Sequence, residues 1–102
     1  MSVLIQFSIF PMDKGVSVSR YVARAARIIR DSGLRHEIGA MGTCIEGEWE
    51  AVIGVVTRCF EDLKKDCDRV YMSITGDYRK QGDGRIQDKV KSVERELTQE
   101  QG

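Results

Sequence analysis

Two segments of the chain alternate between apolar side chains and other side chains, which is the pattern of a β-strand with one buried face. The first is residues 3–10, where one face carries Val3, Ile5, Phe7 and Ile9. The second is residues 69–77, where one face carries Val70, Met72 and Ile74. Residues 34–40 and 43–47 predict two further strands, and the short Met41-Gly42 link between them favours an antiparallel hairpin. The pattern therefore predicts four strands.

Apolar residues recur at helical spacing in three other segments. Ser17 is placed to cap a first helix, and Gly33 is placed to end it. Residues 48–66 predict a second helix, whose inward side chains are Trp49, Val52, Val56, Cys59, Phe60 and Leu63. After the polar segment 81–84, a last helix carries a narrow apolar stripe, of the width that helix-helix seams have, made of Ile86, Val90, Val93 and Leu97.

The order of these elements is β-α-β-β-α-β followed by a helix, which is the split βαβ pattern of ferredoxin-like proteins. In that fold two helices cover one face of a four-stranded antiparallel sheet. The sequence shows no linker, repeat or low-complexity segment. We therefore predict an α+β chain in which residues 1–102 form a single ferredoxin-like βαββαβ sandwich with an extra C-terminal helix.

Composition narrows the class of partner. The chain of 102 residues has 16 basic and 16 acidic residues, so its net charge is zero and no bulk field attracts nucleic acid or an anionic membrane. No apolar run approaches the ~20 residues that cross a bilayer. The three cysteines, Cys44, Cys59 and Cys67, lack zinc-binding spacing and suit a reducing compartment. These features predict a cytoplasmic protein that binds no metal, nucleic acid or membrane.

The strand alternation also defines the sheet face that the helices leave uncovered. Its expected side chains are Gln6, Ser8, Phe10, Cys44, Glu46, Tyr71, Ser73, Thr75 and Asp77. This face mixes aromatic, hydroxyl, amide and carboxyl groups. One interpretation is an ordinary solvated face of an antiparallel sheet. The other is a face that packs on a second subunit and leaves a polar pocket for a small ligand.

Two acidic positions on this face have alternative roles. Glu46 ends a strand beside Gly47, which permits a sharp turn. Its carboxylate either lies at a helix N-terminus or serves as the counter-charge of a cationic ligand. Asp77 and Arg79 share a strand face. They either form a surface ion pair, or Arg79 contacts a polar or anionic group of a ligand.

No known catalytic motif occurs in the sequence. His36 alternates in phase with neighbouring apolar residues, which favours a packed histidine over a general base. Cys44 has no evident activating base, which favours a structural role. Trp49 is expected in the core or at an interface. A solvated helix face, rather than a phosphate site, is expected for Arg20, Arg24 and Arg27.

Several short motifs together resemble one known family. They are Gly42-Thr43-x-Ile45-Glu46-Gly47-Glu48-Trp49, preceded by Ser19-x-Tyr21-Val22-Ala23 and followed by Asp77-x-Arg79 and Lys89-Val90-x-Ser92-Val93. With these motifs, nearly the whole chain resembles the small thiamine-binding proteins. The resemblance implies a ferredoxin-like protomer that forms dimers and then tetramers by packing sheets together. It also implies that thiamine, or its pyrimidine portion, is bound at or near a subunit interface.

The same resemblance suggests roles for individual residues, because thiamine has a cationic thiazolium and an aminopyrimidine ring. Glu46 would contact the cation or the aminopyrimidine. Thr43 and Ser8 would exchange hydrogen bonds with the ligand, and Phe10 would stack on it. The candidate ligand-binding set is completed by Asp77 and Arg79.

Three functions are open at this point. The first is non-catalytic binding of thiamine or a related pyrimidine by a homo-oligomer, expected to be a dimer of dimers, with thiamine as bound ligand and no other cofactor. The second is a small cytosolic enzyme acting on thiamine-like compounds, with Cys44, His36 or Asp77 as candidate chemistry. The third is a structural or regulatory oligomer that binds no ligand and docks through the stripe on its last helix. We favour the first.

Overall fold

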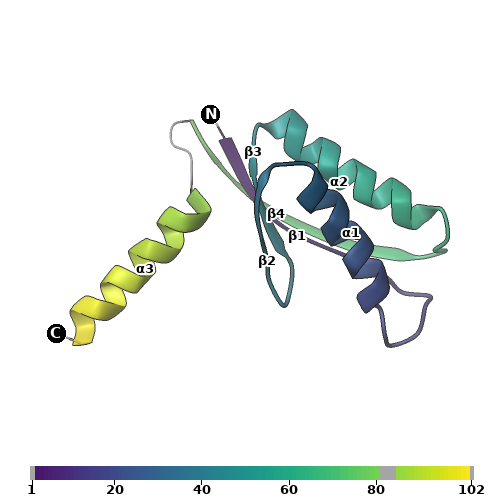
Figure 1. Cartoon of the computed structure of the whole chain (residues 1–102), viewed down its shortest axis with the longest axis horizontal. Helices are drawn as coiled ribbons and strands as arrows, with labels where there is room; N and C mark the ends of the chain where they lie inside the picture. The colour runs from purple at the N-terminus through teal and green to yellow at the C-terminus, as the bar shows by residue number, and fades with distance from the viewer. Residues whose placement is uncertain (1, 81–84, 102) are drawn as a thin grey trace.

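The computed structural model describes residues 2–80 and 85–101 (Figure 1). Their helices and strands are β1 (Ser2–Pro11), α1 (Ser19–Asp31), β2 (Arg35–Ile38), β3 (Thr43–Gly47), α2 (Trp49–Lys64), β4 (Val70–Arg79) and α3 (Arg85–Gln101). The predicted order of elements is confirmed, and the predicted strands and second helix begin and end within two residues of the observed ones. The polar segment predicted at 81–84 lies outside the described residues.

The four strands form one sheet in the order β2-β3-β1-β4, and every neighbouring pair is antiparallel. Both α1 and α2 lie on one side of this sheet, whereas α3 extends away from it (Figure 1). This is the predicted ferredoxin-like arrangement with an extra C-terminal helix. The other face of the sheet is left uncovered by α1 and α2.

The core lies between the sheet and helices α1 and α2. Alternate side chains of β1 enter it, and all of these are at most 5% exposed: Val3, Ile5, Phe7 and Ile9. The inward stripe of α2 meets them with Val52, Cys59 and Leu63, which have no exposed surface. The strand and helix periods of the sequence therefore identify the main packing surface correctly.

Of the two positions predicted for Trp49, the core is wrong, because its side chain is 61% exposed, and a position at an interface stays a prediction. Trp49 is the first residue of α2, and it stands beside the outer strand β4, where Gly76 has no side chain to pack on the indole. A helical stripe gives the direction of a side chain but does not show whether another element covers it.

The prediction that Ser17 caps the first helix is also wrong. The N-cap residue of α1 is Val18, and no side chain supplies a capping hydrogen bond. The Val18 carbonyl accepts hydrogen bonds from two backbone N–H groups of the first turn, at 3.0 Å each, so the helix begins one residue later. The prediction for the other end is confirmed, since Gly33 follows the helix with φ at 77°, a conformation that favours glycine.

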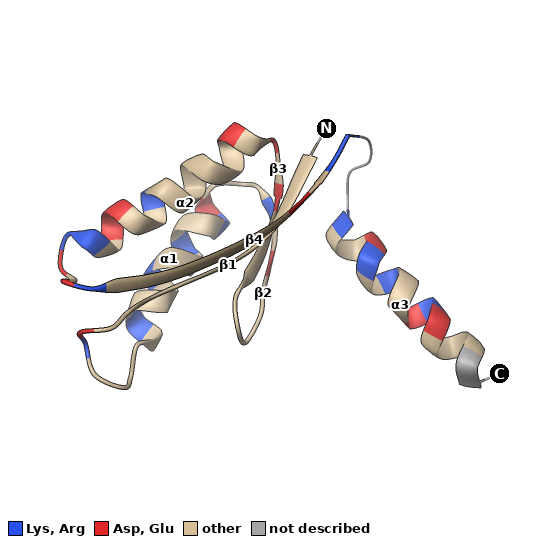
Figure 2. Ribbon diagram, turned by 180° about the vertical axis from the view of Figure 1, so that it is seen from behind, with Lys and Arg blue, Asp and Glu red and all other residues tan. Residues whose placement is uncertain are grey.

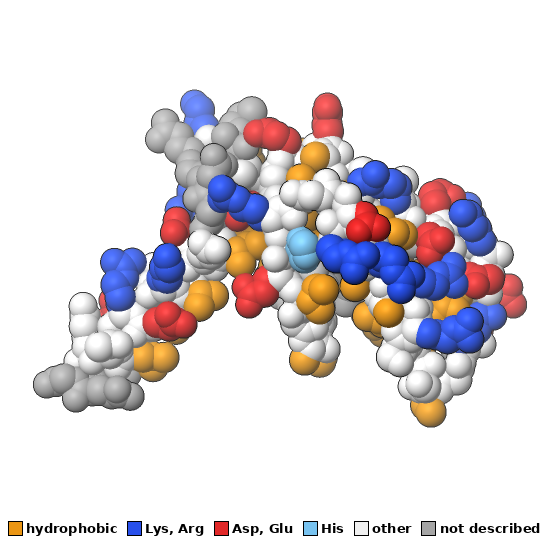
Figure 3. All heavy atoms as spheres, in the orientation of Figure 1, with side chains coloured by type: hydrophobic (Ala, Val, Ile, Leu, Met, Phe, Trp, Pro, Cys, Tyr) orange, Lys and Arg blue, Asp and Glu red, His pale blue; other side chains and the backbone are white. Residues whose placement is uncertain are grey.

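One arginine of the basic stripe joins the two covering helices. Arg24 Nε lies 3.0 Å from Asp62 Oδ2, and Arg24 Nη1 lies 2.8 Å from Asp66 Oδ2. The hydrogen bond from Arg24 to Asp66 holds the pKa of the Asp66 carboxyl below its usual range. Figure 3 shows Lys and Arg side chains gathered over α1. The ion pairs of Arg24 connect α1 to α2.

A matched pair of valines tests the core. We expect Val52→Ala to lower the free energy of unfolding by about 1.5 to 3 kcal/mol, because it removes buried methyl groups and leaves a cavity. Val16→Ala, at a fully exposed loop position, is expected to change it by less than about 0.5 kcal/mol. Urea unfolding followed by circular dichroism measures both, and equal effects would contradict the described packing.

Candidate functional site

The sheet face opposite α1 and α2 carries the side chains expected there. The pairing register aligns cross-strand neighbours in four rows, namely Phe10 with Tyr71, Ser8 with Ser73, Gln6 with Cys44 and Thr75, and Leu4 with Glu46 and Asp77. The predicted strand parity is therefore confirmed. The rows also show that the candidate residues of this face divide between its two ends.

At one end, Glu46 holds the start of α3. Its carboxylate accepts hydrogen bonds from the backbone N–H of Arg85 at 3.1 Å and of Ile86 at 3.4 Å. Only 4% of Glu46 is exposed. A carboxylate in this position satisfies otherwise unpaired N–H groups and interacts favourably with the positive end of the helix dipole. The structure thus places Glu46 at a helix N-terminus, and that helix is α3.

Asp77 holds the same helix through charged side chains. Lys89 Nζ lies 2.7 Å from Asp77 Oδ2, and Arg85 Nη1 lies 3.3 Å from the same oxygen. Arg85 is almost completely buried, and its Nη2 also donates to the backbone oxygens of Ser2 and Asp77. Figure 2 shows these acidic strand ends close to the basic first turns of α3. Asp77 therefore has partners on α3 in place of the predicted Arg79.

These contacts lower the pKa of Asp77. The hydrogen bond from Lys89 is the largest cause, and the charges of Arg85 and Arg79 act in the same direction. Arg79 is exposed at the end of β4, on the same face as Asp77. It acts on Asp77 through charge rather than through the ion pair that the sequence suggested.

At the other end of the face, hydroxyl and aromatic side chains pair across β1 and β4. Ser8 Oγ lies 2.8 Å from Ser73 Oγ. The rings of Phe10 and Tyr71 are 5.4 Å apart between centroids and tilted by 33°. Both pairs border the edge of β1 that lies beyond the end of β3.

A cavity of about 510 Å³ lies against this edge, between α1 and the β2-β3 hairpin. The pairing of β1 with β3 ends where Phe7 faces Thr43, so the next residues of β1 have no β3 partner. The polar side chains that line the cavity are Ser8, Ser73 and Thr43, and its aromatic lining includes Phe10 and Tyr71. Apolar side chains of α1, such as Val22, form the opposite wall.

The cavity brings together three of the six candidate ligand-binding residues, which are Ser8, Phe10 and Thr43. Thr43 is 8% exposed and lies on the helix-covered side, because it is paired with Phe7. The other three candidates, Glu46, Asp77 and Arg79, do not line it. Sequence reasoning did not select Tyr71 and Ser73, although their positions opposite Phe10 and Ser8 would have followed from the strand register.

Of the three residues considered for catalysis, Cys44 and Asp77 lie on the uncovered face of the sheet and His36 lies on the opposite face. His36 is paired with the core residue Ile45, and its Nδ1 lies 2.9 Å from the Leu34 carbonyl oxygen. Cys44 is paired with Gln6 on the uncovered face. All three cysteines have free thiols. In the part of the chain that the structure describes, no three His, Cys, Asp or Glu side chains are grouped to hold a metal, and no helix is long and apolar enough to cross a membrane.

Comparison with known proteins gives the family. The model of the thiamine-binding protein family matches residues 5–94. The chain belongs to this thiamine-binding family. Its relatives include proteins of Mycobacterium bovis and Mycobacterium tuberculosis, both named UPF0045 proteins, which are 41% identical over 98 residues. Each alignment covers 95% of this chain and 96% of the relative.

Solved structures confirm the fold of this family member. A protein of Methanocaldococcus jannaschii has a TM-score of 0.83 at 34% identity, covering 90% of this chain and 95% of its own. A Thermotoga maritima protein has a TM-score of 0.80 at 24% identity, covering 91% of this chain and 99% of its own. The latter is named as a candidate thiamine biosynthesis or salvage protein, and at that identity it supports the fold alone.

The anchoring of α3 by Glu46 can be tested by amide hydrogen exchange. We expect Glu46→Ala to speed amide exchange in the first turn of α3, because two N–H groups lose their hydrogen-bond acceptor. The loss is expected to destabilise the start of the helix by about 0.5 to 2 kcal/mol. Glu37→Ala, an exposed position on the same sheet face, serves as the control. Unchanged exchange at Arg85 and Ile86 in the Glu46→Ala variant would contradict the anchor.

The ion pair of Asp77 has a pH dependence with a defined sign. Because its pKa lies below the ordinary value of 3.8, the contact is complete above that value and is lost as the pH falls through the lowered pKa. We expect Lys89→Met to raise the pKa of Asp77, as followed by NMR of the carboxyl carbon, and Lys91→Met to leave it unchanged. A lower pKa in the Lys89→Met variant would contradict the assignment.

Proposed function

We propose that the protein binds thiamine, or a thiamine-related pyrimidine, in the cavity at the free edge of β1 and does not convert it. The observation that supports this site is the meeting of Ser8, Phe10 and Thr43 around one space. Its volume of about 510 Å³ lies within the range of small-molecule sites. The name of the family supports the ligand class.

The lining suits the two rings of thiamine in different ways. Hydroxyl groups of Thr43 and Ser8 can donate to or accept from the nitrogen atoms of an aminopyrimidine. Phe10 and Tyr71 offer aromatic faces for stacking and for a cation-π contact with the thiazolium. In this proposal the aromatic pair, and not Glu46, receives the positive charge, because Glu46 is occupied by the start of α3.

We propose further that the protein is a homo-oligomer, a dimer of dimers, with the cavity near a subunit interface. Support comes from the apolar stripe of α3, where Val90, Val93 and Leu97 are 47%, 60% and 53% exposed. A helix face of this kind gains free energy when a neighbour covers it. The three free thiols fit a cytoplasmic location, where cysteines stay reduced.

The absence of turnover is part of the proposal. His36 and Cys44 lie on opposite sides of the sheet, so they cannot act as a base and nucleophile pair. Incubation of the protein with thiamine, its phosphates and the free pyrimidine is expected to return each compound unchanged. Chromatographic detection of a product would favour the enzyme instead.

Isothermal titration calorimetry with thiamine, thiamine phosphate and the hydroxymethylpyrimidine tests the site. We expect Thr43→Val, which keeps the shape and removes the hydroxyl, to weaken binding by about twofold to tenfold. Phe10→Leu is expected to weaken binding of the same compounds, since it removes an aromatic face. Thr75→Val is the matched control, because Thr75 lies on the same sheet but does not line the cavity.

The titration has two outcomes against the proposal. No heat with any of the three compounds would exclude thiamine-type binding at the concentrations used. Binding that Thr43→Val and Phe10→Leu leave unchanged would move the site elsewhere on the molecule.

A further inference from the structure

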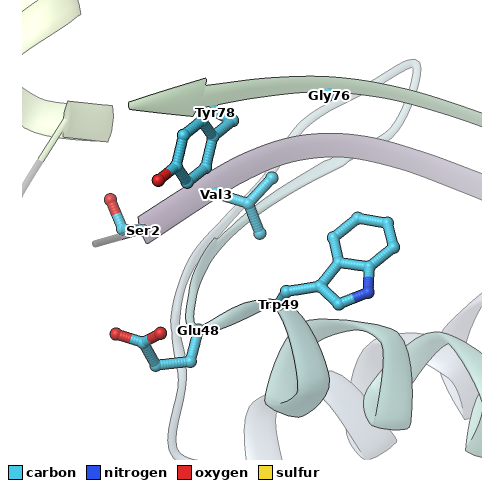
Figure 4. Close-up of a pocket in the computed structure, with 6 residues that line it drawn as sticks. All are labelled: Ser2, Val3, Glu48, Trp49, Gly76 and Tyr78. Carbon is cyan, nitrogen blue, oxygen red and sulfur yellow. The ribbon is translucent and has the colours of Figure 1, made fainter. Parts of the chain in front are cut away.

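A second hollow lies on the helix-covered side of the sheet, between the outer strand β4 and the first turn of α2 (Figure 4). Its volume is about 490 Å³, and its lining residues are Ser2, Val3, Glu48, Trp49, Gly76 and Tyr78. It shares no lining residue with the cavity at the free edge of β1. It is therefore a separate candidate site.

The strand register explains how the chain forms this hollow. Tyr78 on β4 faces Val3 on β1, and Val3 faces Gly47 on β3. The next residues after Gly47 are Glu48 and Trp49, where α2 begins. Tyr78 therefore lies at one end of this row of the sheet, and Glu48 and Trp49 follow its other end. Gly76 lies two residues before Tyr78 on the same strand face and leaves the floor open, because it has no side chain.

Two large aromatic side chains remain exposed around this space. Trp49 is 61% exposed and Tyr78 is 62% exposed. In Figure 4 their rings stand on either side of Val3. Aromatic side chains usually contribute to a core, so two unburied rings beside one hollow indicate a surface that another group covers.

Glu48 adds a negative charge at the N-terminus of α2. Glu48 is the N-cap residue of the helix, yet its side chain makes no capping hydrogen bond. It is the single charged residue among those lining the hollow. The basic side chains Arg85 and Lys89 form their ion pairs with Asp77, whose side chain belongs to the opposite sheet face, although Arg85 Nη2 also donates to the backbone oxygen of the lining residue Ser2.

We propose that this hollow binds a small organic cation of the quaternary ammonium type. The positive group lies against the faces of Trp49 and Tyr78, and Glu48 provides the counter-charge. Aromatic faces attract such cations through the ring quadrupole, and a weakly hydrated cation is easily transferred from water to an aromatic surface. Anions are disfavoured by Glu48, and neutral compounds of the same shape lack both electrostatic contacts.

The chain contains one tryptophan, so its fluorescence reports on this hollow directly. We would titrate the full chain with choline and, in parallel, with 3,3-dimethylbutanol, its neutral isostere. We expect a saturable change in Trp49 emission with choline and none with the alcohol. Choline has no pyrimidine ring, and Thr43→Val is expected to leave its binding unchanged, so this test is independent of the thiamine proposal.

Substitutions of Tyr78 and Glu48 test whether these side chains contact the bound choline. Tyr78→Leu and Glu48→Gln are each expected to weaken choline binding by about twofold to thirtyfold, whereas Tyr78→Phe keeps the ring and retains binding. Thermal unfolding of each variant confirms that it is folded.

Three results of the titrations would overturn the proposal. They are a response to the alcohol equal to that to choline, no saturable response at all, and binding that Tyr78→Leu and Glu48→Gln leave unchanged. Sedimentation provides a further test: if Trp49→Leu dissociates an oligomer, a second copy of the chain covers the hollow and the cation site is wrong.

Discussion

The unequal pairing of strand β1 determines most of this structure. β4 pairs with β1 along all ten of its residues, from Ser2 to Pro11, whereas β3 pairs with it only from Val3 to Phe7. Buried backbone groups must find hydrogen-bond partners, so an edge that β3 leaves free has to be met by water, side chains or a ligand. The cavity lined by Thr43 exists at that point because β3 begins there.

The opposite end of the same sheet has a different role. There all four strands are paired, and the row of Leu4, Glu46 and Asp77 supports the first turn of α3. Because α3 contacts the body through a few polar groups at its start, its apolar stripe is free to pack on another surface. The sheet thus has the cavity lined by Thr43 toward one end and the anchor of α3 at the other.

Much of this arrangement follows from the sequence. Strand alternation placed Ser8, Phe10, Glu46 and Asp77 on the uncovered face, because a period of two fixes the face of each side chain once the core face is known. The same rule assigns Thr43 to the helix-covered face, on the same side as Ile45. Thr43 lines the cavity only because it is the first residue of β3. The residue at which β3 begins depends on the β2-β3 hairpin, and strand periodicity does not predict it.

The partners of Glu46 and the exposure of Trp49 could not be obtained in this way. Glu46 meets backbone groups 39 and 40 residues further along the chain, a separation that no local pattern describes. Trp49 has the correct helical phase for burial, but burial also needs a covering side chain, and β4 offers Gly76 at that point. Both results depend on tertiary geometry rather than on local preference.

The position of Glu46 also changes how the proposed binding of a cationic ligand would work. A carboxylate that is only 4% exposed and already accepts hydrogen bonds from two N–H groups at the positive end of a helix has little remaining attraction for a ligand cation. If the Glu46 carboxylate turned to a ligand, the N–H groups of Arg85 and Ile86 would lose their hydrogen-bond acceptor. Aromatic faces have no such competing partners, and the ring pair of Phe10 and Tyr71 at the cavity is therefore better suited than Glu46 to receive a positive charge.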